Sequence, residues 1–345
     1  MAYTTINKST EHFNTKLYTG NGSTQSITGV GFQPDWSWLK SRNNTYDNFL
    51  YDAVRGQGKY LQSNRTSAEA DTDQMTSFDS DGYTVGVTGG VATNGSGSTM
   101  ASWNWKANGA GSANTAGSIN STVSVNTTSG FSIVSYTGTG SLATVGHGLG
   151  VAPAMIIIKN RSTTNGWEVY HQSLGNTKYM QLHTTSAEGT SATRWNNTSP
   201  TSTVFTVNTE GGVNSSGGNL IAYCFAEKQG YSKFGNYTGN GNNDGTFVYT
   251  GFKPAFVMLK NTTTAASWLM YDNKRLGYNV DNNELVANTS AAEETYDQID
   301  ILSNGFKMRA NGTSTNKSGD TFIYMAFASA PLVGGTGAGV PCTAR

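Results

Sequence analysis

Charge is scarce in this sequence and evenly balanced. Lys and Arg number 22, Asp and Glu number 22, and charged residues make up 13% of the 345 residues. A chain without an excess of either sign has no global field to attract nucleic acid or an anionic membrane, so we expect neither as a partner. Long apolar runs are also missing. None approaches the ~20 residues of a membrane-spanning helix, so no membrane insertion is expected.

Cysteine and proline are rare too, with 2 and 6 residues. Cys224 lies in the apolar segment 220–226, which predicts a buried free thiol. The sequence leaves open whether Cys224 pairs with Cys342 near the C-terminus. The start of the chain has no basic segment followed by an apolar stretch, so we expect no secretory signal and assembly in a cytoplasm.

Glycine and aromatic residues are abundant. There are 42 Gly, 7 Trp, 17 Tyr and 14 Phe, and Asn, Thr and Ser occur throughout. Polar turn residues in such number are typical of short strands joined by many turns, and the aromatic residues indicate a packed core. The composition therefore predicts an all-β globular protein.

One motif occurs three times and organises the chain. A Gly and a Pro precede an apolar run that ends in Lys, in segments 31–40, 148–159 and 251–260. Each copy follows a Tyr-Thr-Gly-x-Gly segment, at 18–22, 136–140 and 237–241. The proline is expected at the entry of a buried strand, because inside a central strand it would remove a ladder hydrogen bond. The pattern is an internal triplication.

The triplication predicts three tandem β-sandwich domains of jelly-roll type. The expected segments are an N-terminal arm (1–12), repeat one (13–107), a Gly/Ser/Asn-rich linker (108–127), repeat two (128–229), repeat three (230–331) and a Gly-rich C-terminal tail (332–345). The large Trp residues of the alternating strands, at 36, 38, 103, 105, 167 and 268, are interpreted as core.

Catalytic motifs are missing around the four histidines. His171 follows a strand Tyr at the position where the other repeats have Asp52 and Asp272, which indicates a hydrogen bond at a strand end. Glu69, Glu188 and Glu293 recur after an Ala. Each repeat offers one such carboxylate without a partner for acid–base chemistry, so we interpret them as structural groups that cap backbone amides. No enzymatic activity is expected.

A cluster of aspartates at 71, 73, 79 and 81 could suggest Ca²⁺. Its spacing differs from that of an EF-hand, and repeat two has no equivalent, so a solvated loop is the better interpretation. We expect no metal site and no cofactor.

Three residues are candidates for ligand binding. Trp195 and its neighbour Arg194 have no counterpart in the other repeats and lie in a polar segment, and Tyr46 is similarly placed among Asn and Asp. An exposed aromatic ring can stack on a sugar while polar neighbours bind hydroxyl groups. An ordinary loop aromatic packed on its own domain is the alternative for each.

Repeat one carries a distinctive set of segments: YTGNG at 18–22, GFQPDWSWLK at 31–40, YDAVRGQGKYLQSN at 51–64, SFDSDGYTVG at 77–86 and WNWKA at 103–107. This set, with the ending 327–345, resembles a repeat domain of structural proteins from tailed bacteriophages, especially phages of marine bacteria and cyanobacteria. Repeats two and three keep the skeleton but lose the VRG and WKA segments. The resemblance implies concanavalin-A-like or laminin-G-like jelly rolls, and it supplies no binding residues.

The resemblance also implies a location in the virion and partners among other virion proteins, with homo-oligomeric assembly. One expectation is a tail fibre or tail-associated protein that presents lectin-like sandwiches to host-surface glycans. The alternative is a capsid decoration protein, and the lack of heptads for a coiled-coil shaft favours it somewhat. A glycan-degrading enzyme is a third reading.

Overall fold

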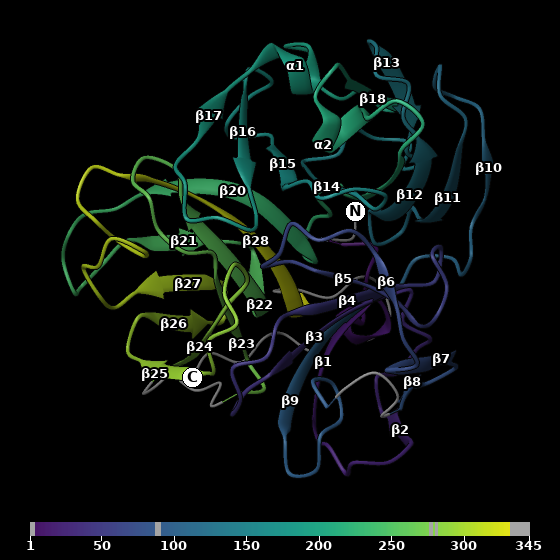
Figure 1. The fold of residues 1–345 in the computed structure, drawn as a ribbon. Coiled ribbons are helices and arrows are strands. Elements are labelled where there is room, and N and C mark those ends of the chain that lie inside the picture. The colour runs from purple at the N-terminus through teal and green to yellow at the C-terminus, as the bar shows by residue number, and fades with distance from the viewer. Residues whose placement is uncertain (1–3, 87–90, 276–278, 280–281, 332–345) are drawn as a thin grey trace.

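The structure is a computed structural model that describes residues 4–86, 91–275, 279 and 282–331. It is all-β, as predicted, and its antiparallel sheets group into three sandwich-like units that follow the three repeats. The units lie round a common centre, with repeat one in purple and blue, repeat two in teal and repeat three in green and yellow (Figure 1). The predicted tail (332–345), and with it Cys342, lies outside the described residues.

Sandwich one has a six-stranded sheet and a three-stranded sheet. The large sheet has the order β1 (Phe13–Thr19), β9 (Thr99–Trp105), β3 (Trp36–Ser41), β4 (Phe49–Asp52), β5 (Lys59–Gln62) and β6 (Ala70–Asp71). The small sheet has the order β2 (Gln25–Thr28), β8 (Gly82–Val85) and β7 (Met75–Asp79).

Sandwich two has a larger sheet of eight strands, in the order β10 (Ser112–Asn114), β11 (Ser121–Asn126), β12 (Phe131–Thr137), β19 (Asn219–Phe225), β14 (Met155–Asn160), β15 (Trp167–His171), β16 (Lys178–Gln181) and β17 (Gly189–Thr190). Its small sheet pairs β13 (Ala143–Gly146) with β18 (Val204–Val207).

Sandwich three has a six-stranded sheet in the order β20 (Ser232–Thr238), β28 (Thr321–Pro331), β22 (Phe252–Asn261), β23 (Leu269–Asp272), β24 (Asn282–Val286) and β25 (Glu294–Tyr296). Its small sheet has the order β21 (Phe247–Tyr249), β27 (Gly305–Met308) and β26 (Ile299–Leu302). The helices among the described residues are short: η1 (Ser9–Glu11), α1 (Ala192–Trp195) and α2 (Gly211–Asn214).

The segment 108–127, expected to be a linker, is part of sandwich two. It contributes both β10 and β11, and β11 pairs with β12 along its whole length, from Ser121 opposite Tyr136 to Asn126 opposite Phe131. Small polar residues suit a strand at a sheet edge as well as a flexible connection, so composition alone does not distinguish the two.

The repeated Gly-Pro motif has a conformational cause. Gly31, Gly148 and Gly251 adopt positive φ angles of 91°, 72° and 82° in the turns before β3, β14 and β22. Residues with a Cβ rarely adopt these angles, which explains a glycine in all three copies. Pro34 and Pro153 precede their strands as predicted, whereas Pro254 lies inside β22, where the pairing with β28 shifts register on both sides of it. This irregularity accommodates a residue that cannot donate to the ladder.

The central strands of each large sheet are buried on both faces, as the unbroken burial of β3, β14 and β22 from Pro254 onward shows. One face packs on the small sheet of its own sandwich, as Leu39 and Tyr51 do with Tyr83 in repeat one. The other face joins a core shared by all three repeats, which contains Trp36, Trp103, Tyr223, Phe225, Phe256 and Phe327 among others.

Three equivalent residues mark the centre of this shared core. The rings of Trp105, Phe225 and Phe327, one from the closing strand of each repeat, form a triangle with centroid distances of 6.4, 5.6 and 6.0 Å. The predicted core role of the Trp residues is correct, but for Trp36, Trp38, Trp103, Trp105, Trp167 and Trp268 the core lies between sandwiches. The three repeats are therefore one cooperative body with a pseudo-threefold arrangement. The N-terminal arm belongs to it, because Ile6 is buried in the same core.

Candidate functional site

The residues proposed for sugar stacking in repeat two are buried. Ser191 caps α1 by accepting the Thr193 N–H at 3.2 Å, and the helix packs Trp195 into the core of sandwich two with 2% of its surface exposed. The Trp195 Nε1–H donates to the Lys178 carbonyl at 3.1 Å. The premise of an exposed loop aromatic is therefore wrong for Trp195, and its ring offers no open face to a sugar.

Arg194 is buried as well, with 8% exposure. Its Nε donates to Glu168 at 2.5 Å, and its guanidinium carbon lies 3.5 Å from the centre of the Tyr179 ring. Burial would lower the pKa of this guanidinium, but Glu168 outweighs it and raises the pKa. Arg194 is thus a structural cation with a buried partner. That partner could not be identified from the local sequence, because Glu168 lies 26 residues earlier.

Tyr46 belongs to a different sandwich and is half-buried. Its carbonyl accepts the Lys40 Nζ at 2.6 Å, and its side chain lines a shallow surface pocket of about 270 Å³ together with Asn43 and Asn44. The structure therefore does not bring the three candidate residues together. Of the three, Tyr46 alone keeps an accessible surface.

Three lysines link the repeats into a ring. From the sequence they were identified only as the residues that end the apolar runs. The Nζ of Lys159 donates to the Thr66 carbonyl of repeat one at 3.2 Å, and that of Lys260 to the Thr185 carbonyl of repeat two at 3.2 Å. The Nζ of Lys40 donates to the Ser290 carbonyl of repeat three at 3.0 Å, which closes the ring. All three side chains are fully buried, and burial lowers the pKa of each to about 8.

The recurrent glutamates form the second element of the ring. The N–H groups of Glu69, Glu188 and Glu293 donate to the carbonyls of Arg161, Thr262 and Arg42, each in the following repeat, at 2.9, 2.9 and 2.7 Å. The same link thus occurs at each of the three boundaries.

The glutamate carboxylates do not cap backbone amides, and that interpretation is wrong for Glu69 and Glu293. Arg161 donates twice to Glu69, at 2.8 Å each, and Arg42 donates twice to Glu293, at 2.9 and 2.7 Å. Buried Arg55 and Arg275 add a further bond to each carboxylate, at 3.2 and 2.9 Å. Burial would raise the pKa of both glutamates, but these guanidinium groups outweigh it and hold the pKa below its usual value.

The boundary between repeats two and three lacks this charge network. Strand pairing places Leu174 where Arg55 and Arg275 occur, and Thr262 where Arg42 and Arg161 occur. Glu188 instead pairs with Lys178 of its own repeat. Leu174 stands where the aspartate partner of the arginine is also replaced, by His171, and Glu188 keeps Lys178 as its cation, so no buried charge is left alone.

His171 belongs to the same exchange. In the other repeats the equivalent aspartate accepts a bond from a neighbouring repeat: Asp52 from the Tyr223 hydroxyl at 2.7 Å and Asp272 from the Trp103 Nε1–H at 3.0 Å. The counterpart of these donors at the third boundary is Met325, which cannot donate. His171 uses its Nε2–H to reach the Tyr324 carbonyl at 3.2 Å, and its Nδ1 accepts the Ser173 N–H at 3.2 Å. The predicted strand-end hydrogen bond is present.

The His171 ring is therefore held neutral. It is fully buried, and burial lowers its pKa to about 4 despite the contact with the Tyr324 carbonyl.

Glu284 on β24 is a buried acid whose pKa is raised to about 7 by burial. Its carboxylate is 2.5 Å from the Tyr271 hydroxyl and accepts Gln298 Nε2 at 2.9 Å. Sequence reasoning missed Glu284 because it replaces the tyrosines found at this strand position in repeats one and two.

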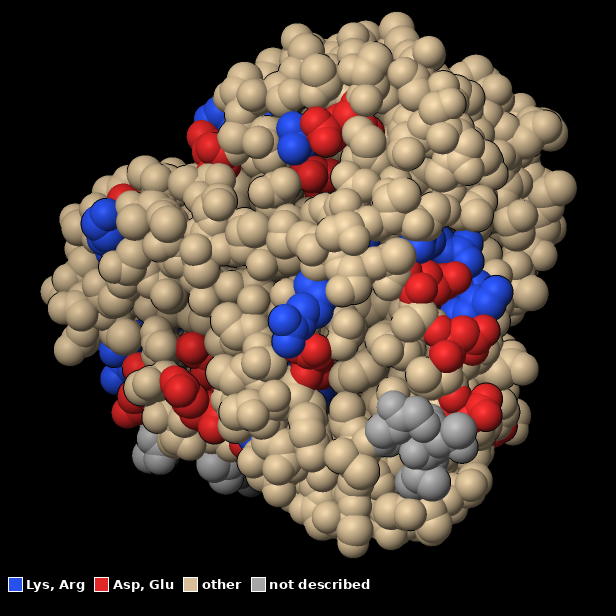
Figure 2. Space-filling view, in the orientation of Figure 1, with Lys and Arg blue, Asp and Glu red and all other residues tan. Residues whose placement is uncertain are grey.

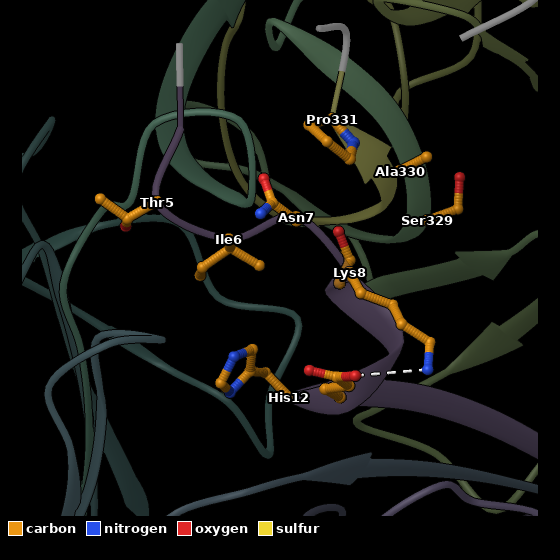
Figure 3. Close-up of a pocket in the computed structure, with 10 residues that line it drawn as sticks. Thr5, Ile6, Asn7, Lys8, His12, Ser329, Ala330 and Pro331 are labelled. Atoms are coloured by element: carbon orange, nitrogen blue, oxygen red, sulfur yellow. Dashed lines mark hydrogen bonds and ion pairs between the residues drawn. The ribbon is translucent and has the colours of Figure 1, made fainter. Parts of the chain in front are cut away.

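A pocket lies where the N-terminal arm passes the end of β28 (Figure 3). Its volume is about 620 Å³, and Ile6, His12 and Pro331 are among the residues that line it. Lys8 and Glu11 pair with each other at its rim, at 3.3 Å. The described lining therefore offers main-chain groups and small side chains more than reactive ones.

Two aspartates of the segment 71–81 serve turns. Asp81 accepts the N–H groups of Gly29 and Gly31 at 2.9 and 2.7 Å, and these bonds hold its pKa below the usual value. Asp79 accepts the Thr84 hydroxyl at 2.8 Å. Within residues 4–86, 91–275, 279 and 282–331, no group of three or more His, Cys, Asp or Glu side chains is placed to hold a metal ion. Cys224 is a buried free thiol.

The surface reflects the composition. On the face drawn in Figure 2, charged side chains form small clusters of both signs within a mostly uncharged surface. The described part of the chain has no helix long and apolar enough to cross a membrane.

Comparisons with known proteins agree with the extent of the folded body. A family model described as a domain of unknown function (DUF7483) matches residues 8–331. The match begins at the arm that enters the shared core and ends at the last residue of β28, so it treats the three repeats as one unit. No curated protein matches the chain.

Proposed function

Since the chain belongs to the DUF7483 family, we propose its role from its architecture: it is a non-enzymatic structural protein of a tailed-phage virion. We place it in the tail, where it presents three lectin-like sandwiches to the host surface and contacts other virion proteins. It acts as a compact head rather than as a shaft, and it assembles in the host cytoplasm.

The observation that carries this proposal is the closed ring. The lysine and glutamate links recur at all three boundaries, and the aromatic triangle lies at their centre. Buried lysine side chains and main-chain hydrogen bonds therefore hold the three sandwiches in fixed relative positions. A body of this kind keeps the loops at the sandwich ends in a rigid display, which suits attachment by variable loops on a fixed scaffold.

A second candidate is a capsid decoration protein. One chain that presents three similar units round an axis suits a local threefold position of an icosahedral shell, and the sequence has no heptads for a shaft. The burial of Trp195 and Arg194 adds weight to this candidate, because it removes two of the three residues proposed for glycan contact.

Cryo-electron microscopy of intact particles, reconstructed without imposed symmetry around the tail, tests the proposal. Density of this three-lobed body at the tail, with sandwich ends pointing outward, is the expected result, and glycan-array binding follows from it. Density on the shell would replace the tail assignment by the second candidate. Absence from particles would overturn both and reopen the glycan-degrading enzyme.

A further inference from the structure

Sandwich two closes one of its edges with a segment that has no counterpart among the described residues of the other two sandwiches. β11 pairs along β12, and the residues before it cross to the small sheet, where Ile119 forms a parallel bridge with Val145 of β13. The Ile119 N–H donates to the Thr144 carbonyl at 2.9 Å. Ile119 and Val123, 6% and 4% exposed, enter the core of this sandwich. One extended segment thus seals the gap between the two sheets.

The equivalent edge of sandwich three is open. β20 corresponds to β12, since Ser232 lies opposite Phe327 as Phe131 lies opposite Phe225. β21 corresponds to β13, since Val248 lies opposite Phe306 as Val145 lies opposite Phe205. Among the described residues, β20 pairs only with β28 and β21 only with β27. A groove of about 310 Å³ lies between them, where the covering segment would run.

Two exposed aromatic residues flank this groove. Phe247 and Tyr249 are 44% and 49% exposed and occupy the positions that are Thr144 and Gly146 in sandwich two. Large apolar side chains on an uncovered edge strand are typical of a surface that pairs with another segment. The edge of sandwich one differs, because the counterparts on β2 are Ser26 and Thr28.

Side-chain bonds limit how much of the edge is free. The Phe234 N–H donates to Glu227 at 3.4 Å, and the Phe234 carbonyl accepts Gln172 Nε2 at 2.7 Å. The Thr238 carbonyl accepts the Thr246 hydroxyl at 2.8 Å. The Lys233 Nζ donates to the Tyr249 carbonyl of β21 at 3.2 Å. The part that remains for pairing is therefore centred on Asn236 and Phe247, and it suits a short strand rather than one as long as β11.

We propose that the β20–β21 edge of sandwich three binds a short extended segment of another protein, which adds a strand as residues 118–123 do in sandwich two. The occupant is an uncharged Ser/Thr-rich strand with a β-branched apolar side chain in the place of Ile119. Its main chain pairs at Asn236 and at Phe247 of β21. Its apolar side chain packs on Val248 and Tyr237, which line the groove, as Ile119 packs beside Val145 in sandwich two. This mode of recognition draws affinity from main-chain bonds and specificity from one apolar pocket.

The test uses the full chain and a fluorescent peptide with the sequence of residues 116–124, measured by anisotropy. Phe247→Asp places a charge in the groove, and Asn236→Pro removes the outward amide from an edge strand, where proline is tolerated. Ser26→Asp adds the same charge at the counterpart position of sandwich one and is the matched control. We expect saturable binding that weakens at least tenfold in both groove variants and changes less than twofold in S26D.

Each other outcome overturns the assignment. Absence of saturable binding up to about 1 mM peptide, which corresponds to about −4 kcal/mol, would show that the edge does not accept a strand. Equal binding to the wild type and to F247D would place the peptide elsewhere. Light scattering that shows a dimer of the wild type and a monomer of F247D would make a second copy of this chain the occupant.

Discussion

Acid should weaken the boundary between repeats two and three through His171. The ring is fully buried, its Nε2–H donates to the Tyr324 carbonyl, and its Nδ1 accepts the Ser173 N–H. A proton on Nδ1 would place two donors face to face and put a charge in the shared core without a carboxylate partner. The folded state therefore resists protonation, and the unfolded chain does not.

The magnitude follows from the two pKa values. The pKa is about 4 in the folded protein and 6.5 when unperturbed. The unfolded state binds more protons between these values, so the stability contributed by neutral His171 is complete above pH 6.5 and declines as the pH falls toward 4. At about 1.4 kcal/mol per pH unit, the full loss is about 3 kcal/mol, and about 2.5 kcal/mol of it is lost by pH 4.5.

The assay is urea unfolding followed by Trp fluorescence at pH 7.5 and pH 4.5, for the wild type and His171→Asn. The Asn side chain can accept the Ser173 N–H, as Asp52 accepts the Arg55 N–H in repeat one, but it does not titrate. Other groups, including the remaining histidines, titrate equally in both proteins, so the difference isolates His171. We expect the wild type to lose about 2.5 kcal/mol more than the variant between the two pH values. An equal loss in both proteins would refute the reasoning.

Three further predictions concern the ring and the core. Glu69→Gln should destabilise the protein by about 3 kcal/mol in urea unfolding, because it leaves Arg55 and Arg161 without this carboxylate. Glu188→Gln should cost less than about 1 kcal/mol, because its partner Lys178 is 38% exposed. Similar costs for the two variants would contradict the role of the buried charge network. The free energy of unfolding should rise between pH 7 and 9 by about 1 kcal/mol for each of Lys40, Lys159 and Lys260. The reason is that their pKa of about 8 in the folded protein lies below the unfolded value of 10.5, so the unfolded state binds more protons. In Lys159→Met the rise should be smaller by about a third, and an unchanged rise would contradict the lowered pKa of Lys159. Trp105→Phe should cost about 1 kcal/mol, because within the described residues its indole N–H has no partner and the other repeats use Phe there. Trp103→Phe should cost about 3 kcal/mol, because it also removes the indole hydrogen bond to the charged, buried Asp272, and thermal unfolding distinguishes the two variants.

The architecture of each repeat was accessible from the sequence because its signals are local. The glycine before each buried strand reflects a positive φ angle, and the apolar runs reflect strands that are covered on both faces. The same runs also indicate that each large sheet has a second covered face. A strand buried on one face should alternate, and β3 and β14 do not, so each large sheet needed a second partner.

The relations between repeats were not accessible, because they depend on pairs that are far apart. Lys40 and Ser290 are 250 residues apart, and neither residue type indicates the other. The exposure of Trp195 was misjudged for a similar reason: Asn and Thr surround it in sequence, but a four-residue helix turns its ring inward. Polar neighbours in the sequence indicate that a segment lies near the surface, but they do not determine whether one side chain of that segment points outward or into the core.

The shared core has a consequence for synthesis of the chain. The aromatic face of repeat one, with Trp36 and Trp105, is covered by Tyr223, Phe225 and Phe327, and the last of these lies in β28. At translation rates of about 5–20 residues per second, repeat one waits roughly 10–45 s before the ribosome has made its final cover. During that interval the nascent chain carries a bare aromatic surface, which a chaperone would recognise and which would expose any prematurely terminated product to aggregation or proteolysis. The closing strand of the last repeat therefore also reports that all three repeats have been made.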